Sequence, residues 1–206
     1  MDQRDYTPGD MGAILSAFAE ANLPAHDGSE ARSPKPVKLD QYPGDLIEAV
    51  LGNDVAHPLL TMSHIDGKGF PFTSVMGFSF LDGKIHICSR ANAFKNKRLA
   101  ENPRCSMIYH NNIPRPTKLG CLTLVGKVRL SQDADLVHRA NVALSHKVFR
   151  DGDPDVDQRQ PMIESMDEAD RTVIILDEVV GVYIISPMLP NLPAGIPTPV
   201  ISWRGD

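Results

Sequence analysis

The segment LLTMSHIDGKGFPFTSVMGFSFLDGKIHICS, residues 59–89, carries the strongest fold signal in this chain. It contains three runs rich in apolar residues, which the turn signals Asp66–Gly69 and Asp82–Gly83 separate from one another. Short glycine-containing turns between such runs are typical of β-hairpins. The segment therefore predicts three antiparallel strands, over Leu59–Ile65, Phe72–Leu81 and Lys84–Ser89.

The remaining residues predict three more strands and two main helices. The expected strands are Arg104–His110, Cys121–Leu130 and Thr172–Ile185, the main helices are Asn92–Glu101 and about Asp133–Phe149, and shorter helices are expected near Asp45–Gly52 and Pro161–Asp167. Six strands joined mostly by tight turns favour an antiparallel barrel over a sheet of βαβ units. The chain is therefore predicted to be mainly β, with inserted helices.

Composition divides the chain into three parts. Residues 1–44 combine a helical pattern at Met11–Ala21 with a proline-rich segment, and they predict an N-terminal helix and arm. Residues 45–186 hold the expected strands and form the predicted barrel domain. Residues 187–206 contain five prolines without a hydrophobic period, so we expect a proline-rich C-terminal tail.

Length and charge argue against several classes of protein. The 206 residues suit a single domain, and the net charge of -5 argues against binding to nucleic acid or a membrane surface. The sequence has no apolar run of about 18 residues, and its polar N-terminus lacks the apolar core of a secretory signal. Its three cysteines lack CxxC spacing and are typical of buried thiols in a reducing compartment. We therefore expect a cytoplasmic protein.

Residues 89–104, SRANAFKNKRLAENPR, form a basic segment in an acidic chain. Five cationic side chains surround a single acid, Glu101. The segment follows a predicted strand and begins where a helix starts, and a helix N-terminus with nearby lysines is a natural binding site for phosphate. The segment therefore predicts an anion site. A solvated helical lysine is the alternative interpretation of each cation.

Several short motifs occur in order along the chain. They are Leu60–Ser63, Gly69–Pro71, Thr73–Met76, Asp82–Ile87, Lys95, Leu99, Asn102–Arg104 and Gly126–Val128. Together they resemble the FMN-binding split barrel of the pyridoxamine 5'-phosphate oxidase-like family, which includes flavin and deazaflavin oxidoreductases. The resemblance covers roughly residues 57–186.

The resemblance implies a six-stranded antiparallel split β-barrel that forms a homodimer, with its cofactor at the subunit interface. FMN is the expected cofactor, and the deazaflavin coenzyme F-420 is the alternative. Thr73, Ser74, Val75 and Met76 would lie along the isoalloxazine ring. Ser89, Arg90 and Lys95 would surround the phosphate, with Lys97 or Arg98 as lesser candidates. An exposed strand face is the alternative interpretation of Thr73 and Ser74.

Two departures from the family pattern bear on this site. Many relatives carry Ser-Arg-Lys where this chain has Ala93-Phe94-Lys95, so one phosphate contact is missing or comes from Arg90. The tail also lacks the arginine- and histidine-bearing strand that holds the substrate phosphate in pyridoxamine phosphate oxidases, so vitamin B6 oxidation is not expected. Trp203, the only tryptophan, would cover the cofactor ring or the partner subunit, or simply pack in the core.

The resemblance favours an oxidoreductase that acts on a small organic substrate, with the redox chemistry in the cofactor. It requires no catalytic acid or base, and the sequence identifies neither the substrate nor the electron donor. The histidines and cysteines lack the spacing of zinc ligands, so no metal site is expected. A non-catalytic flavin- or haem-binding protein is a second hypothesis. A cofactor-free barrel whose basic patch binds an acidic partner is a third.

Overall fold

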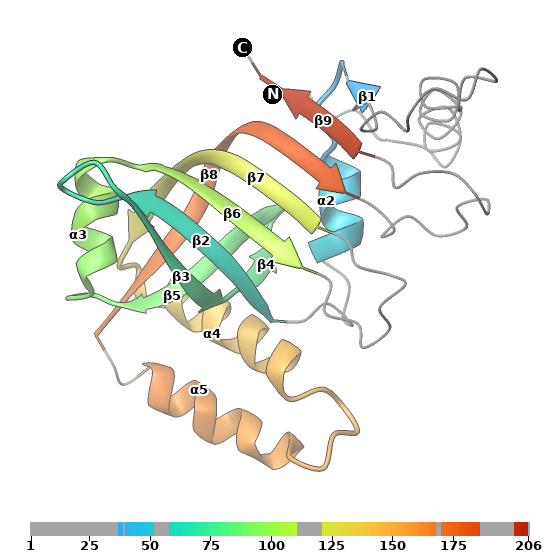
Figure 1. Cartoon of the computed structure of the whole chain (residues 1–206). Helices are drawn as coiled ribbons and strands as arrows, with labels where there is room; N and C mark the ends of the chain where they lie inside the picture. Colours follow the sequence, from blue (N-terminus) through green and yellow to red (C-terminus); the bar gives the residue numbers. More distant parts are fainter. Residues whose placement is uncertain are drawn as a thin grey trace.

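The computed structural model describes residues 37–38, 40–51, 58–110, 121–167, 170–185 and 200–205. Their strands form a half-open barrel, with helices at its ends and below it (Figure 1). The elements are β1 (Val37–Lys38), α2 (Gly44–Leu51), β2 (Leu59–Ile65), β3 (Pro71–Gly77), β4 (Ser79–Leu81), β5 (Lys84–Arg90), α3 (Phe94–Glu101), β6 (Arg104–His110), β7 (Cys121–Ser131), α4 (Ala134–Val148), the short 3₁₀ helix η1 (Val156–Gln158), α5 (Arg159–Asp167), β8 (Arg171–Ile185) and β9 (Val200–Arg204). The helix expected near the N-terminus lies outside the described residues.

Strand β8 joins the two walls of the barrel. The sheet runs in the order β1-β9-β8-β7-β6-β2-β3, and β5 pairs with β8 on one side and with β4 on the other. Among the described strands only β1 and β9 pair in parallel. Within the same residues β3 pairs with β2 alone, so the barrel is split between β3 and the β4–β5 hairpin. The prediction of a mainly β, antiparallel split barrel is confirmed.

Most of the predicted elements lie where the local sequence signals indicated. Strands β2 and β6 have the predicted bounds. Helix α4 lies within the predicted range because Asp133 caps it, with its carboxylate accepting the N–H of Leu136 at 2.8 Å. A carboxylate in this position pairs one of the N–H groups that the first helical turn leaves free.

The strand predicted over Phe72–Leu81 is wrong in one respect, because the chain bends inward at Phe78 and divides it into β3 and β4. The Phe78 side chain is fully buried, and its ring meets that of Tyr109 edge-on with 5.8 Å between centroids. A Cβ atom at Gly77 would lie 3.2 Å from the Leu144 side chain of α4. Glycine therefore allows the helix to approach the backbone at the bend.

The end of the proline-rich tail forms a strand, β9, that the sequence analysis did not predict. It pairs with the end of β8, and β1 of the N-terminal part pairs with β9 in turn. Trp203 of β9 is 6% exposed, and its ring packs edge-on against Tyr42 with 5.2 Å between centroids. Of the interpretations considered for Trp203, packing in the core describes its position.

The inside of the barrel is a continuous apolar core. Every wall contributes fully buried side chains, among them Met62, Ile87, Met107, Leu124 and Ile174. Burial of an apolar side chain of this size contributes roughly 1.5–3 kcal/mol relative to exposure. A smaller cluster lies between α4 and the outer side of β8, built by Val137, Ala140, Val173 and Ile175.

In the described part of the chain, none of the helices has the length and hydropathy needed to cross a bilayer.

Candidate cofactor site

The inner face of the β2–β3 hairpin carries two polar side chains among apolar ones. The register pairs His64 with Phe72 and Met62 with Ser74, and side chains opposite each other in a sheet point to the same face. His64 is 2% exposed, and its ring centroid lies 5.5 Å from that of Phe72. The hairpin therefore holds an imidazole and a hydroxyl at the mouth of the barrel.

The residues predicted to line the cofactor ring fall on both faces of β3. Ser74 and Met76 point inward, whereas Thr73 and Val75 point outward and are exposed. On the outer face the Thr73 hydroxyl lies 2.9 Å from the hydroxyl of Ser63. Because β3 is an edge strand in the described sheet, its free edge also offers backbone N–H and C=O groups to a ligand. Side chains alone do not bring the four residues together, but this edge runs beside all of them.

Ser89 and Arg90, at the end of β5, also point to opposite faces. Ser89 is 3% exposed and lies opposite Thr172 of β8 on the inner side. Arg90 is exposed and lies opposite Arg171. The structure therefore brings Ser89, but not the side chain of Arg90, to the inside of the barrel.

Lys95 is a half-buried cation in the first turn of α3. Burial lowers the pKa of its ammonium group. In the part of the chain that the structure describes, no carboxylate lies within ion-pair distance of Lys95. The one acid of the basic segment, Glu101, instead pairs with Arg98 at 2.8 Å. A desolvated cation without a counter-charge would be stabilised by an anionic ligand.

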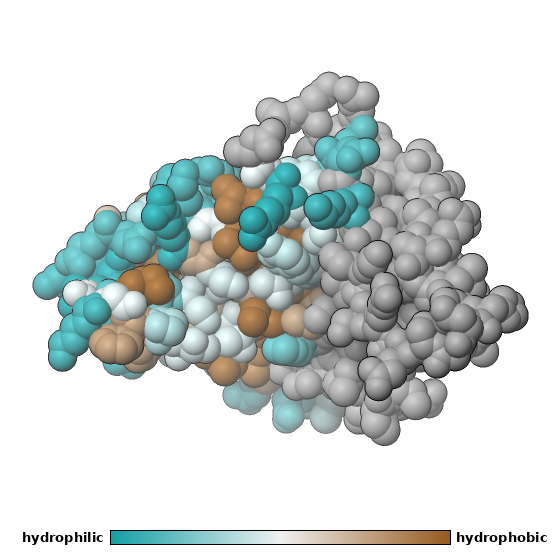
Figure 2. Space-filling model, turned by 45° about the horizontal axis from the view of Figure 1, so that its top comes forward, coloured by the Kyte–Doolittle hydropathy of each residue, from teal (hydrophilic) through white to brown (hydrophobic). Residues whose placement is uncertain are grey.

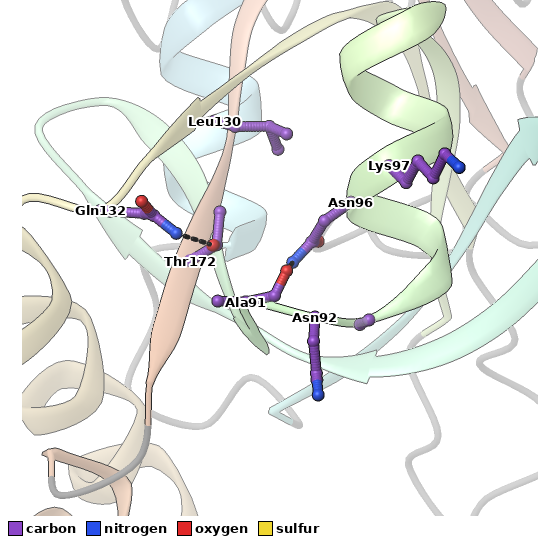
Figure 3. A pocket seen from close by; sticks show the side chains of 8 residues that line it. Ala91, Asn92, Asn96, Lys97, Leu130, Gln132 and Thr172 are labelled. Carbon is purple, nitrogen blue, oxygen red and sulfur yellow. Dashed lines mark hydrogen bonds between the residues drawn. The ribbon is translucent and has the colours of Figure 1, made fainter.

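Lys97 lies on a different side of α3. Two residues span about 200° of an α-helix, so Lys95 and Lys97 project in nearly opposite directions. Lys97 borders a cavity of about 530 Å³ between α3 and the adjoining ends of β7 and β8 (Figure 3). The other residues that line this cavity are Ala91, Asn92, Ala93, Asn96, Leu130, Gln132 and Thr172. The Lys97 amine points away from Leu130 and Thr172 in Figure 3, and Lys95 does not line the cavity. The two predicted lysines thus do not form one site.

His64 lies within the electrostatic influence of Lys95. Burial lowers the pKa of the His64 imidazole, the charge of Lys95 lowers it further, and Asp66 partly opposes both. Both ring nitrogens of His64 and the hydroxyl of Ser74 are buried without a hydrogen-bond partner among the described residues. Buried polar atoms are nearly always paired in folded proteins. We refer to His64, Ser74 and Lys95, none of which has a hydrogen-bond or ion-pair partner within the described chain, as the polar cluster.

Sequence analysis considered His64 only as a metal ligand and missed it as a member of the polar cluster. The available signal was its position, because the alternation of the strand places it on the same face as Leu60 and Met62. A histidine on an inward-facing position of an apolar strand needs a partner. The described residues contain no group of three or more histidine, cysteine or acidic side chains placed to hold a metal ion.

The outer face of the wall formed by β3, β2, β6 and β7 has no charged residue in its central band. The register places eight side chains there: Thr73, Val75, Thr61, Ser63, Ser106, Ile108, Thr123 and Val125. None of the described helices covers this face in Figure 1, and Figure 2 shows pale and brown surface between hydrophilic margins. A solvated face of an antiparallel sheet usually carries polar residues, including charged ones. This uncharged face therefore differs from an ordinary solvated sheet face, and three of its eight side chains, Val75, Ile108 and Val125, are apolar.

The chain is a split antiparallel barrel with a cationic helix beside it, and the comparison with protein families assigns it to one family of this architecture. The family model described as "Pyridoxamine 5'-phosphate oxidase" matches residues 47–178, which is more than half of the chain. The protein belongs to this family, and the resemblance inferred from its motifs is confirmed. A comparison with curated protein sequences finds no match.

Solved structures share the fold at low sequence identity. A conserved hypothetical protein from Mycobacterium tuberculosis superposes with a TM-score of 0.54 at 16% identity, over 80% of this chain and 85% of the other. A haem-binding protein from Mycobacterium smegmatis gives a TM-score of 0.50 at 18% identity, over 71% of this chain and 55% of the other. A protein of unknown function from Agrobacterium tumefaciens gives 0.51 at 15% identity, over 77% and 64% of the two chains. At these identities the likeness establishes the fold alone.

Proposed function

We propose that this protein is a homodimeric oxidoreductase that binds FMN at the edge of β3 and acts on a small organic substrate. The observation that carries the proposal is the polar cluster of His64, Ser74 and Lys95, which lacks partners among the described residues. A flavin phosphate would provide Lys95 with a counter-charge and would give the polar atoms of the cluster acceptors. Membership of the pyridoxamine 5'-phosphate oxidase family supports the choice of a flavin.

The residues of the chain suit the parts of this cofactor. Lys95 would bind the phosphate, because a charge-assisted contact offsets the cost of burying an ammonium group. Ser74 and Ser89 are inward-facing hydroxyls that could bond phosphate or ribityl oxygens. The free backbone edge of β3 could pair with the polar edge of the ring. The bound flavin would supply the redox chemistry, and the protein would position it and control access of water.

The outer sheet face supports a homodimer. Its central band is uncharged and includes Val75, which is 65% exposed. A second copy that covers this band would remove apolar surface from water and would lie next to the β3 edge. This arrangement would also enclose the cofactor, because an edge strand leaves one side of a bound ring open.

Two alternatives keep the same site. Coenzyme F-420 also carries a phosphate beyond its ribityl chain, so the Lys95 contact suits it equally. A non-catalytic haem-binding protein is the second alternative, and the observation in its favour is the shared fold with the haem-binding protein from Mycobacterium smegmatis. The buried His64 imidazole is an unpaired nitrogen donor in the same cluster.

The absorption spectrum of the purified protein separates these possibilities. Oxidised flavin gives a yellow protein, haem gives a Soret band, and a colourless protein that binds added F-420 supports the deazaflavin. Lys95→Ala should weaken FMN binding by about 10- to 100-fold, the value of one charge-assisted hydrogen bond. Lys97→Ala is the matched control, since it removes the same charge from the same helix on another side.

Equal losses in the two lysine variants would mean that Lys95 acts only through general electrostatics. A protein that binds none of the three cofactors would remove the proposal. If FMN binds, reduction of the bound flavin by NADH or NADPH distinguishes an oxidoreductase from a flavin carrier.

A further inference from the structure

His64 occupies a position where the barrel otherwise has apolar side chains. Leu60 and Met62 precede it on the inner face of β2, and both are buried in the core. The imidazole itself is 2% exposed, and the half-exposed ring of Phe72 packs beside it. An imidazole in such a position lowers the stability of the fold if its polar atoms remain unpaired. His64 is therefore a candidate for a functional role.

The groups around His64 leave it without a hydrogen-bond acceptor. Lys95 of α3 acts on it through its positive charge. The Asp66 carboxylate in the following turn already accepts the backbone N–H groups of Lys68 at 2.8 Å and Phe70 at 2.9 Å. Cys105, opposite His64 on β6, is a buried thiol whose pKa is raised to about 12 by burial. Neither ring nitrogen of His64 has a partner among the described residues.

The charge state of the imidazole follows from the same surroundings. Burial and Lys95 both lower the pKa of His64, so the ring is neutral near neutral pH and carries one N–H. An anion placed between this N–H and the ammonium group of Lys95, which has no counter-ion among the described residues, would pair with both groups. Phosphate has enough oxygens to accept bonds from a lysine and an imidazole together.

We propose that His64 is a second phosphate-binding residue of the cofactor site, where its neutral imidazole N–H donates to a phosphoryl oxygen that Lys95 also holds. The inference rests on the proposed function, because it assumes that the ligand of the polar cluster carries a phosphate. Because the imidazole is buried, the ligand reaches it only if the Phe72 ring, which packs against it and is 48% exposed at the edge strand, moves aside. His64 thereby supplies a contact that the Ala93-Phe94-Lys95 segment lacks.

The test compares FMN with riboflavin, which has the same ring and no phosphate. Dissociation constants are measured by quenching of flavin fluorescence for the wild type, His64→Leu, His64→Gln and the control His146→Leu, which alters an exposed histidine of α4. We expect His64→Leu to weaken FMN about tenfold without changing riboflavin binding, and His64→Gln, which keeps an N–H donor, to retain most of the FMN affinity. His146→Leu should change neither.

The melting temperature of the ligand-free protein provides the second readout. Leucine removes unpaired polar atoms from an apolar position, so His64→Leu should melt at the same temperature as the wild type or higher. An unchanged ratio of FMN to riboflavin affinity in His64→Leu would overturn the inference and leave the proposed function intact. A lower melting temperature would also overturn it, because the imidazole would then have a structural partner. A wild type that binds neither flavin would instead refute the proposed function itself.

Discussion

Gly126→Ala should destabilise the barrel, because β7 and β8 meet there without room for a side chain. A Cβ atom at residue 126 would overlap the backbone carbonyl oxygen of Glu178 and lie 3.1 Å from the Leu176 side chain. The register between β7 and β8 shifts on both sides of this contact, so the carbonyl is held by a bulged ladder. Overpacking costs roughly 1–3 kcal/mol, and the upper end applies here because the obstacle is backbone.

Gly181→Ala on the partner strand is the matched control. Gly181 lies opposite Val125, and a Cβ atom there would meet its nearest neighbour at 3.5 Å, which is ordinary contact. Neither glycine has a positive φ, so both substitutions lower the entropy of the unfolded chain by the same amount, worth about 0.4–1 kcal/mol. The difference between the two variants therefore isolates the steric contact, at about 3 kcal/mol.

Thermal unfolding followed by circular dichroism measures this difference. For a chain of this length about 3 kcal/mol corresponds to roughly 6–12 °C between the melting temperatures of the two variants. Gly181→Ala should melt at or slightly above the wild-type temperature. Equal melting temperatures for the two variants would refute the reasoning, because the carbonyl of Glu178 would then be free to move away.

Two more perturbations test the proposed dimer face and the packing of α5 on α4. Val75→Lys places a charge in the uncharged band and should convert dimer to monomer in sedimentation experiments. The control Val148→Lys, at an exposed residue of α4, should leave the dimer intact. A protein that remains dimeric with lysine at residue 75 would show that the dimer uses another face. Burial raises the pKa of Asp167, but hydrogen bonds from Asn141 and His138 outweigh it and hold the pKa below the ordinary value of a carboxyl group. This stabilisation is present above the unfolded pKa and lost as pH falls through the folded one, so between roughly pH 5 and 3 the wild type should lose more stability than Asp167→Asn. Parallel losses would exclude the carboxylate as the cause.

Much of the barrel could be predicted because its signals are local. The alternation in Arg104–His110 and the cap at Asp133 lie within the segments that they organise. The bend at Phe78 and strand β9 depend instead on distant partners. Leu144 of α4 sets the first, and pairing with the end of β8 sets the second. A short strand within a proline-rich tail has too few residues to show a period.

The residues predicted for the phosphate site do not all lie on one side of their strand and helix. Ser89 points into the barrel and Lys95 is half-buried, whereas the periods of strand and helix turn Arg90 and Lys97 to other sides. That separation could have been derived from the sequence. The unpaired state of His64 could not, because it depends on which groups three other elements bring near it.

Strand β8 determines when the barrel can close during synthesis. It is hydrogen-bonded to β5, β7 and β9, yet it lies late in the chain, at Arg171–Ile185. Until it emerges from the ribosome, β5 lacks its long-range neighbour, and the apolar sides of β2, β5 and β6 remain open to water. Pairings between distant segments form slowly, and exposed strands readily associate with the wrong partners. We therefore expect chains that end before residue 171 to leave this apolar surface exposed and to be prone to aggregation.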